Sequence, residues 1–133
     1  MTSRTLVSLC LLAAASTACS EARVFTPPAV DLPMRNLQVV PEPRDGMARG
    51  ANVSFSLSFM SVSGGRMTLS ARDQTGTWLL TTEPSVELVP GVPTRLEAWF
   101  AVPATASSVE VIASFHAEGE AKPLDIHFPY TTR

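Results

Sequence analysis

The sequence predicts an all-β fold, namely an antiparallel β-sandwich of seven to eight short strands. Apolar residues occupy alternate positions in several short segments, which is typical of strands with one buried face. Turn-forming residues separate these segments, since eleven prolines and seven glycines are scattered over 133 residues. No window shows a sustained helical face. A closed barrel is the competing all-β arrangement.

The first strand is expected at residues 36–40, and the clearest one follows in ANVSFSLSFM, residues 51–60. There Val53, Phe55, Leu57 and Phe59 alternate with small polar residues, so one face is buried and the other faces water. The next residues, SVSGGR, contain Gly64-Gly65 and predict a hairpin turn.

The same alternation continues to the C-terminus. It predicts further strands within residues 66–72, 77–80, 85–89, 94–100, 108–115 and 123–128. Three connections are expected: a turn in DQTG (73–76), a break at PGVP (90–93), and a hairpin loop in HAEGEAKP (116–123).

The charge of the chain argues against nucleic-acid binding, and its length fits a single domain. The formal net charge is −2, and the charges are scattered without a run of one sign, so the sequence offers no basic face for nucleic acid. The chain is long enough for one domain.

The N-terminus has the features of a targeting segment. One positive charge, Arg4, precedes the apolar run LVSLCLLAAA at residues 6–15, and small residues lead to Cys19. The apolar run is too short to span a bilayer, which needs about 20 residues. In this order the features resemble the lipobox signal of bacterial lipoproteins. An ordinary secretory signal cut after Ala18 and an uncleaved anchor are the alternatives.

The lipobox resemblance implies that residues 1–18 are removed, together with Cys10, and that Cys19 is acylated. One acyl chain anchors only marginally, whereas two or three hold a protein stably on a membrane. Residues 19–35, with Pro27, Pro28 and Pro33, then form a tether, and residues 36–133 form the domain. Because Ser20 is not Asp, the resemblance implies the periplasmic face of the outer membrane in a host with two membranes.

The domain resembles immunoglobulin-like bacterial modules of the CARDB and adhesion type. The segments that carry the resemblance are NLQVVPEP (36–43), RGANVSFSLSF (49–59) and VELVPGVPTRLEAWF (86–100). The Cys-Trp-Cys framework of immunoglobulins is absent, so burial of apolar side chains must hold the two sheets together.

The sequence contains no catalytic constellation, and we expect no enzyme activity, cofactor or metal. Its two histidines, His116 and His127, fall on outward positions. If their strands form a hairpin, one register places His127 opposite Ile112 and about 13 Å from His116 along the strand. A second register brings them to a diagonal about 7 Å apart, and only that register would allow a shared metal.

Trp99 falls on the outward phase of its strand, and exposed tryptophan is enriched where proteins meet. Trp99 and Tyr130 are therefore the candidate partner contacts, unless a twist or bulge turns Trp99 inward. We predict a membrane-anchored lipoprotein that displays a small sandwich to an envelope protein without catalysis. The alternative is a periplasmic ligand- or metal-binding module that uses the histidine-bearing face.

Overall fold

A computed structural model describes residues 33–133, and in that range the chain forms seven strands in two antiparallel sheets. The predicted all-β class is confirmed. The predicted signal segment (1–18), Cys19 and the predicted tether up to residue 32 lie outside the described residues. The strands are β3 (Met34–Val40), β4 (Asn52–Ser61), β5 (Gly65–Asp73), β6 (Ser85–Leu88), β7 (Pro93–Ala101), β8 (Ser108–Ala117) and β9 (Leu124–Thr131).

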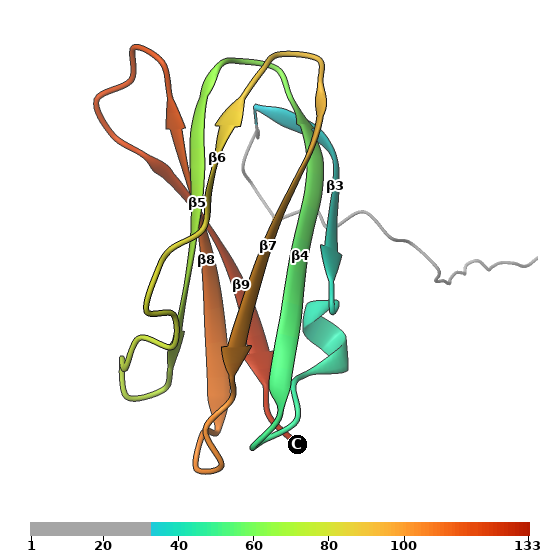
Figure 1. Ribbon diagram of the computed structural model, residues 1–133, viewed down its shortest axis with the longest axis vertical. Helices are drawn as coiled ribbons and strands as arrows, with labels where there is room; N and C mark the ends of the chain where they lie inside the picture. Colours follow the sequence, from blue (N-terminus) through green and yellow to red (C-terminus); the bar gives the residue numbers. More distant parts are fainter. Residues whose placement is uncertain (1–32) are drawn as a thin grey trace, which may run out of the picture.

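The strand order is that of an immunoglobulin-like sandwich. One sheet has the order β3-β4-β7 and the other has the order β6-β5-β8-β9 (Figure 1). In constant-type immunoglobulin domains the fourth strand lies beside the fifth, whereas here the fourth strand, β6, pairs with the third, β5. The predicted immunoglobulin-like β-sandwich is therefore confirmed, with its fourth strand in the larger sheet.

Aromatic rings from both sheets meet in the core. Phe55 of β4 lies with its ring centroid 5.7 Å from that of Phe128 and 6.3 Å from that of Tyr130, both on β9. All three side chains are almost completely buried. These contacts join the two sheets in a domain that has no disulfide within residues 33–133.

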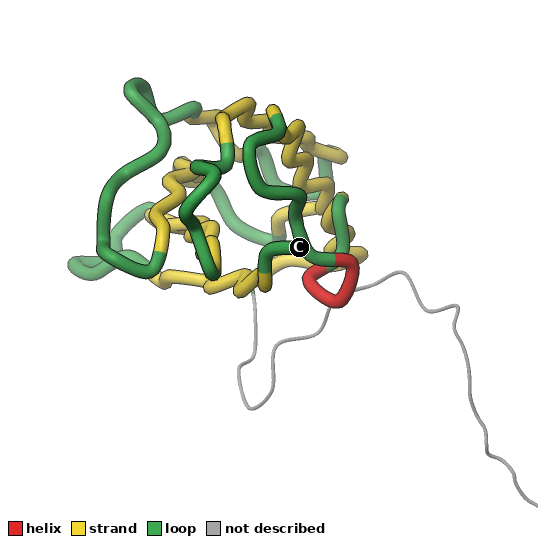
Figure 2. The backbone as a smooth tube through the Cα atoms, turned by 90° about the horizontal axis from the view of Figure 1, so that it is seen from below, coloured by secondary structure: helices red, strands yellow, loops and turns green. Residues whose placement is uncertain are grey.

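At one end of the domain, the segment between β3 and β4 pairs with the C-terminal residues. Met47 donates its backbone N–H to the Thr131 carbonyl at 3.0 Å, and Arg133 donates to the Met47 carbonyl at 3.0 Å. A short 3₁₀ turn, η1 (Pro43–Asp45), lies beside the C-terminus (Figure 2). This pairing covers part of the free edge of β9, which would otherwise present unpaired backbone groups.

The predicted hairpin at Gly64-Gly65 was wrong. The glycines connect β4 to β5, which belong to different sheets, so the chain crosses the sandwich here. Gly65 has φ +144°, and a Cβ at this position would overlap the carbonyl oxygen of His116. Glycine is therefore needed for a close backbone approach rather than for a hairpin turn.

Two further boundaries differ from expectation. Residues 77–80 form no strand, because their contact with β5 is a single bridge between Arg72 and Trp78. The first strand begins at Met34 rather than at residue 36, and Met34 is buried. Between residues 33 and 133, no helix is long and apolar enough to cross a membrane.

Candidate functional site

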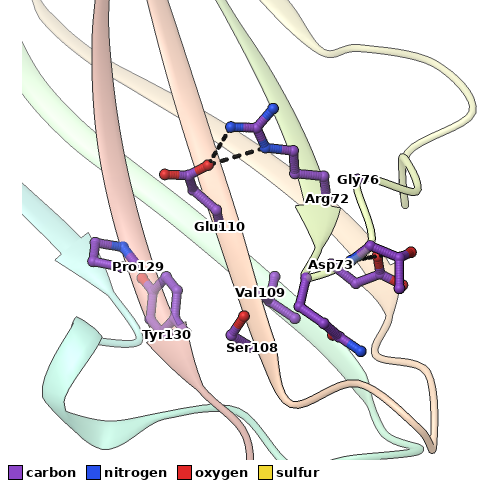
Figure 3. Close-up of a pocket in the computed structure, with 10 residues that line it drawn as sticks. Arg72, Asp73, Gly76, Ser108, Val109, Glu110, Pro129 and Tyr130 are labelled. Carbon is purple, nitrogen blue, oxygen red and sulfur yellow. Dashed lines mark hydrogen bonds and ion pairs between the residues drawn. The ribbon is translucent and has the colours of Figure 1, made fainter.

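Four side chains form a connected row on the outer face of the larger sheet. The Arg72 guanidinium donates to Oε1 of Glu110 from Nη2 at 2.7 Å and from Nε at 3.0 Å (Figure 3). Nδ1 of His127 lies 3.0 Å from Oε2 of the same carboxylate. The guanidinium carbon of Arg72 lies 5.6 Å from the ring centroid of Trp78, within reach of a cation–π contact. We call these four residues the Arg72 row.

Strand register explains why the row forms. Arg72 of β5 is directly opposite Glu110 of β8, and Glu110 is opposite Pro129 of β9. Because side chains alternate between faces, His127 lies on the same face as Pro129, one step diagonally from Glu110. The row therefore ties together the outer faces of three neighbouring strands.

An open pocket of about 500 Å³ lies beside the row. Its lining includes Arg72, Glu110, Pro129 and the turn that follows β5 (Figure 3). In that turn, Oδ1 of Asp73 accepts hydrogen bonds from the Thr75 hydroxyl at 2.6 Å and the Thr75 N–H at 2.9 Å. The Thr75 hydroxyl bond is the main cause of the lowered pKa of Asp73. These hydrogen bonds favour the turn conformation that forms this part of the pocket rim.

Glu110 is the electrostatic centre of the row. Partial burial acts to raise the pKa of Glu110, but hydrogen bonds from Arg72 and His127 outweigh it and lower the pKa below the ordinary value of 4.5. Within residues 33–133, no serine or cysteine side chain hydrogen-bonds to His127. The carboxylate of Glu110 is already engaged by two donors. A polar or charged ligand would therefore contact the exposed edges of the row rather than this carboxylate.

We expect Glu110→Gln to make unfolding less sensitive to acid. The folded-state pKa lies below the unfolded-state value of about 4.5, so the unfolded chain binds more protons in acid. The stabilisation by Glu110 is present above pH 4.5 and is lost as the pH falls through the folded-state pKa. Because Arg72 and Glu110 are both partly exposed, this stabilisation amounts to about 1 kcal/mol at most.

The measurement is urea unfolding of the wild type and the variant between about pH 6 and pH 3. The control is Glu120→Gln in the exposed β8–β9 loop. The difference in unfolding free energy between wild type and Glu110→Gln should shrink as the pH falls. A difference that stays constant over this range would contradict the assigned role of the carboxylate.

The structure selects the first of the two histidine registers. His127 is opposite Ile112, and His116 is opposite Arg66 of β5. The two histidines are therefore separated along the sheet and do not share a site. Among the described residues, no group of three or more histidine, cysteine, aspartate or glutamate side chains is placed to hold a metal.

Trp99 faces outward, as its strand phase predicts. Its side chain is 65% exposed, the largest value for any large hydrophobic residue between 33 and 133. It lies opposite Ser54, and the next row across the sheet consists of Val40, Ser56 and Glu97. We call these five residues the Trp99 face. Ser54, directly opposite the indole, is exposed, whereas Ser56 in the next row is buried.

The prediction that Tyr130 shares an exposed patch with Trp99 was wrong. Tyr130 is only 1% exposed, and its hydroxyl donates to the Pro41 carbonyl at 2.5 Å. Burial, together with the negative charge of Asp45, raises the pKa of Tyr130, so the hydroxyl keeps its proton. Tyr130 is a core residue with a satisfied polar end.

Comparisons with known proteins assign no family. No protein-family model matches the chain, and no curated protein matches it. Among solved structures, a Niemann-Pick type C2 protein from the Japanese carpenter ant is similar, with a TM-score of 0.49 and 13% identity. The match covers 83% of this chain and 99% of that one. The fold described above rests on the strand pairing of this chain itself.

Proposed function

We propose that this chain is a lipid-anchored envelope protein that displays a non-catalytic sandwich to a protein partner through the Trp99 face. The lipobox resemblance supports the anchor at Cys19 and, with Ser20 after it, the periplasmic face of the outer membrane. The observation that carries the binding role is the exposure of Trp99 on the outward face of an edge strand.

The core does not use Trp99. The flanking residues of β7, Ala98 and Phe100, point inward and are buried, so the strand is already fixed by its apolar side. Burial of apolar surface is favourable by about 25 cal/mol per Å². The exposed indole of Trp99 does not contribute this free energy to folding. Tryptophan at such positions is enriched among the residues that dominate binding energy. A partner that covers the indole would recover this energy.

The position of β7 makes the face accessible. β7 pairs with β4 on one side only and forms an edge of the smaller sheet. Arg95 and Glu97 lie on the same outward face and form an ion pair at 2.6 Å. Charged residues beside an exposed aromatic are typical of a protein interface, where a polar rim borders the apolar contact.

We expect Trp99→Ala to weaken partner capture by about 30-fold or more, the effect of losing a binding hot spot. The unfolding free energy should change by no more than about 0.5 kcal/mol, because the side chain is exposed. The measurement is crosslinking capture of the anchored chain from membranes of its native host, alongside a thermal melt of each variant.

The matched control is Trp78→Ala, which removes the other exposed tryptophan of the described domain and leaves the Trp99 face intact. Capture should survive this change. A large loss of stability in Trp99→Ala would place the indole in the core, and capture that is equal in both variants would remove the binding role.

A further inference from the structure

Three exposed valines gather at one end of the sandwich. Val62 lies in the β4–β5 connection, and Val89 and Val92 lie in the β6–β7 connection; each side chain is about half exposed. Both connections are at the same end of the domain (Figure 1). We call these three residues the valine tip.

Backbone hydrogen bonds hold the two connections together. Gly91 donates its N–H to the Ser61 carbonyl at 2.9 Å, and Val92 donates to the Val89 carbonyl at 3.1 Å. Ser61 itself is buried, which fixes the base of the β4–β5 connection in the domain. The backbone of the valine tip is therefore held in place. Its exposed side chains could contact a lipid surface without rearrangement.

The chain enters the domain at this same end. Val62 donates its N–H to the carbonyl of Pro33, the residue that precedes β3, at 2.9 Å. Only thirteen residues, 20–32, lie between Cys19 and Pro33. Even a fully extended chain of that length spans no more than about 50 Å. The tether therefore joins the domain at the end that carries the valine tip, which favours an arrangement in which this end faces whatever holds Cys19.

We propose that the valine tip docks on the lipid surface in which Cys19 is anchored. This inference rests on the lipid anchor of the proposed function. Burial of a valine side chain yields about 1.5 kcal/mol when complete, so three half-exposed valines give only weak binding on their own. The tether raises the effective concentration of the tip at the surface, which makes weak contact sufficient.

The charges near the tip select the kind of surface. The β8–β9 loop at the same end carries Glu118 and Glu120 against a single Lys122 (Figure 1). No excess of basic residues is present in that loop to attract anionic lipid. Docking therefore depends on apolar insertion, and we expect it on zwitterionic phosphatidylethanolamine or phosphatidylcholine with little dependence on salt.

Docking at this end orients the rest of the domain. Asp73, Ser108 and Tyr130 lie near the far ends of β5, β8 and β9, so the pocket beside the Arg72 row is at the end opposite the valine tip. The pocket would then lie at the end of the domain that is far from the membrane. The Trp99 face lies on the side of the sandwich. It would therefore point sideways, parallel to the membrane, and remain accessible to a neighbouring envelope protein.

The test uses protein extracted from membranes of its native host, whose intact mass first establishes whether Cys19 is acylated. If Cys19 is not acylated, the anchor of the proposed function fails. The free thiol can then be coupled to a maleimide lipid, so the docking question is still answered. Anchored protein is placed in phosphatidylcholine–phosphatidylethanolamine nanodiscs that contain a gadolinium-chelating lipid. Amide NMR signals near the membrane lose intensity in such discs.

We expect the signals of Val62, Gly91 and Val92 to be lost while that of Gly76, in the turn at the opposite end, persists. Combined replacement of the three valines by serine should restore the tip signals, whereas Val40→Ser on the Trp99 face should leave the pattern unchanged. Equal signal loss at both ends, or an unchanged pattern in the triple variant, would overturn the docking proposal.

Discussion

Replacement of Phe55 with alanine is expected to lower the free energy of unfolding by about 3–5 kcal/mol. Phe55 is fully buried and contacts rings on the opposite sheet, so its removal leaves a cavity where β4 meets β9. Domains of this size are stable by only about 5–15 kcal/mol, so the variant should be close to unfolding at 37 °C. Urea unfolding followed by far-UV circular dichroism measures the change.

The control is Phe55→Leu, which keeps most of the buried volume and should cost less than Phe55→Ala. The order of the two variants matters more than the absolute values, because the cost depends on how far the site can relax. If Phe55→Ala cost less than about 1 kcal/mol, the two sheets would not be packed through this residue.

Replacement of Cys19 with alanine should move the chain from the membrane fraction to the soluble or unprocessed precursor pool. Each acyl chain adds about 0.8 kcal/mol per buried CH₂, so its loss outweighs any contact that the valine tip can make. Fractionation of the host followed by immunodetection measures the change. Cys10→Ala is the matched control, because that cysteine lies in the segment expected to be removed. Equal membrane retention in both variants would contradict the anchor.

The strands could be predicted because each depends on a local pattern. The alternation of Val53, Phe55, Leu57 and Phe59 with small polar residues marks one buried face, and β4 occupies Asn52–Ser61. The sheet to which each strand belongs depends on distant pairings. A pair of glycines suits both a hairpin turn and a close crossing of two backbones, so Gly64-Gly65 did not reveal the crossing between sheets.

The candidate site was less predictable for the same reason. Arg72, Glu110 and His127 come together only through the way β5, β8 and β9 are aligned with one another. For β8 and β9 the sequence left two possible alignments, and for β5 and β8 it indicated none. Tyr130 is different, because the alternation that places Ile126 and Phe128 inward also places Tyr130 inward. The strand phase alone therefore indicates that Tyr130 is a core residue.

The most direct test of the central claim, a lipid-anchored domain, is the intact mass of the chain isolated from its native host. We predict a polypeptide that begins at Cys19 and carries the added mass of two or three acyl chains, recovered with the outer membrane. A soluble chain without acyl groups, whether it begins at Cys19 or keeps its first 18 residues, would contradict the account.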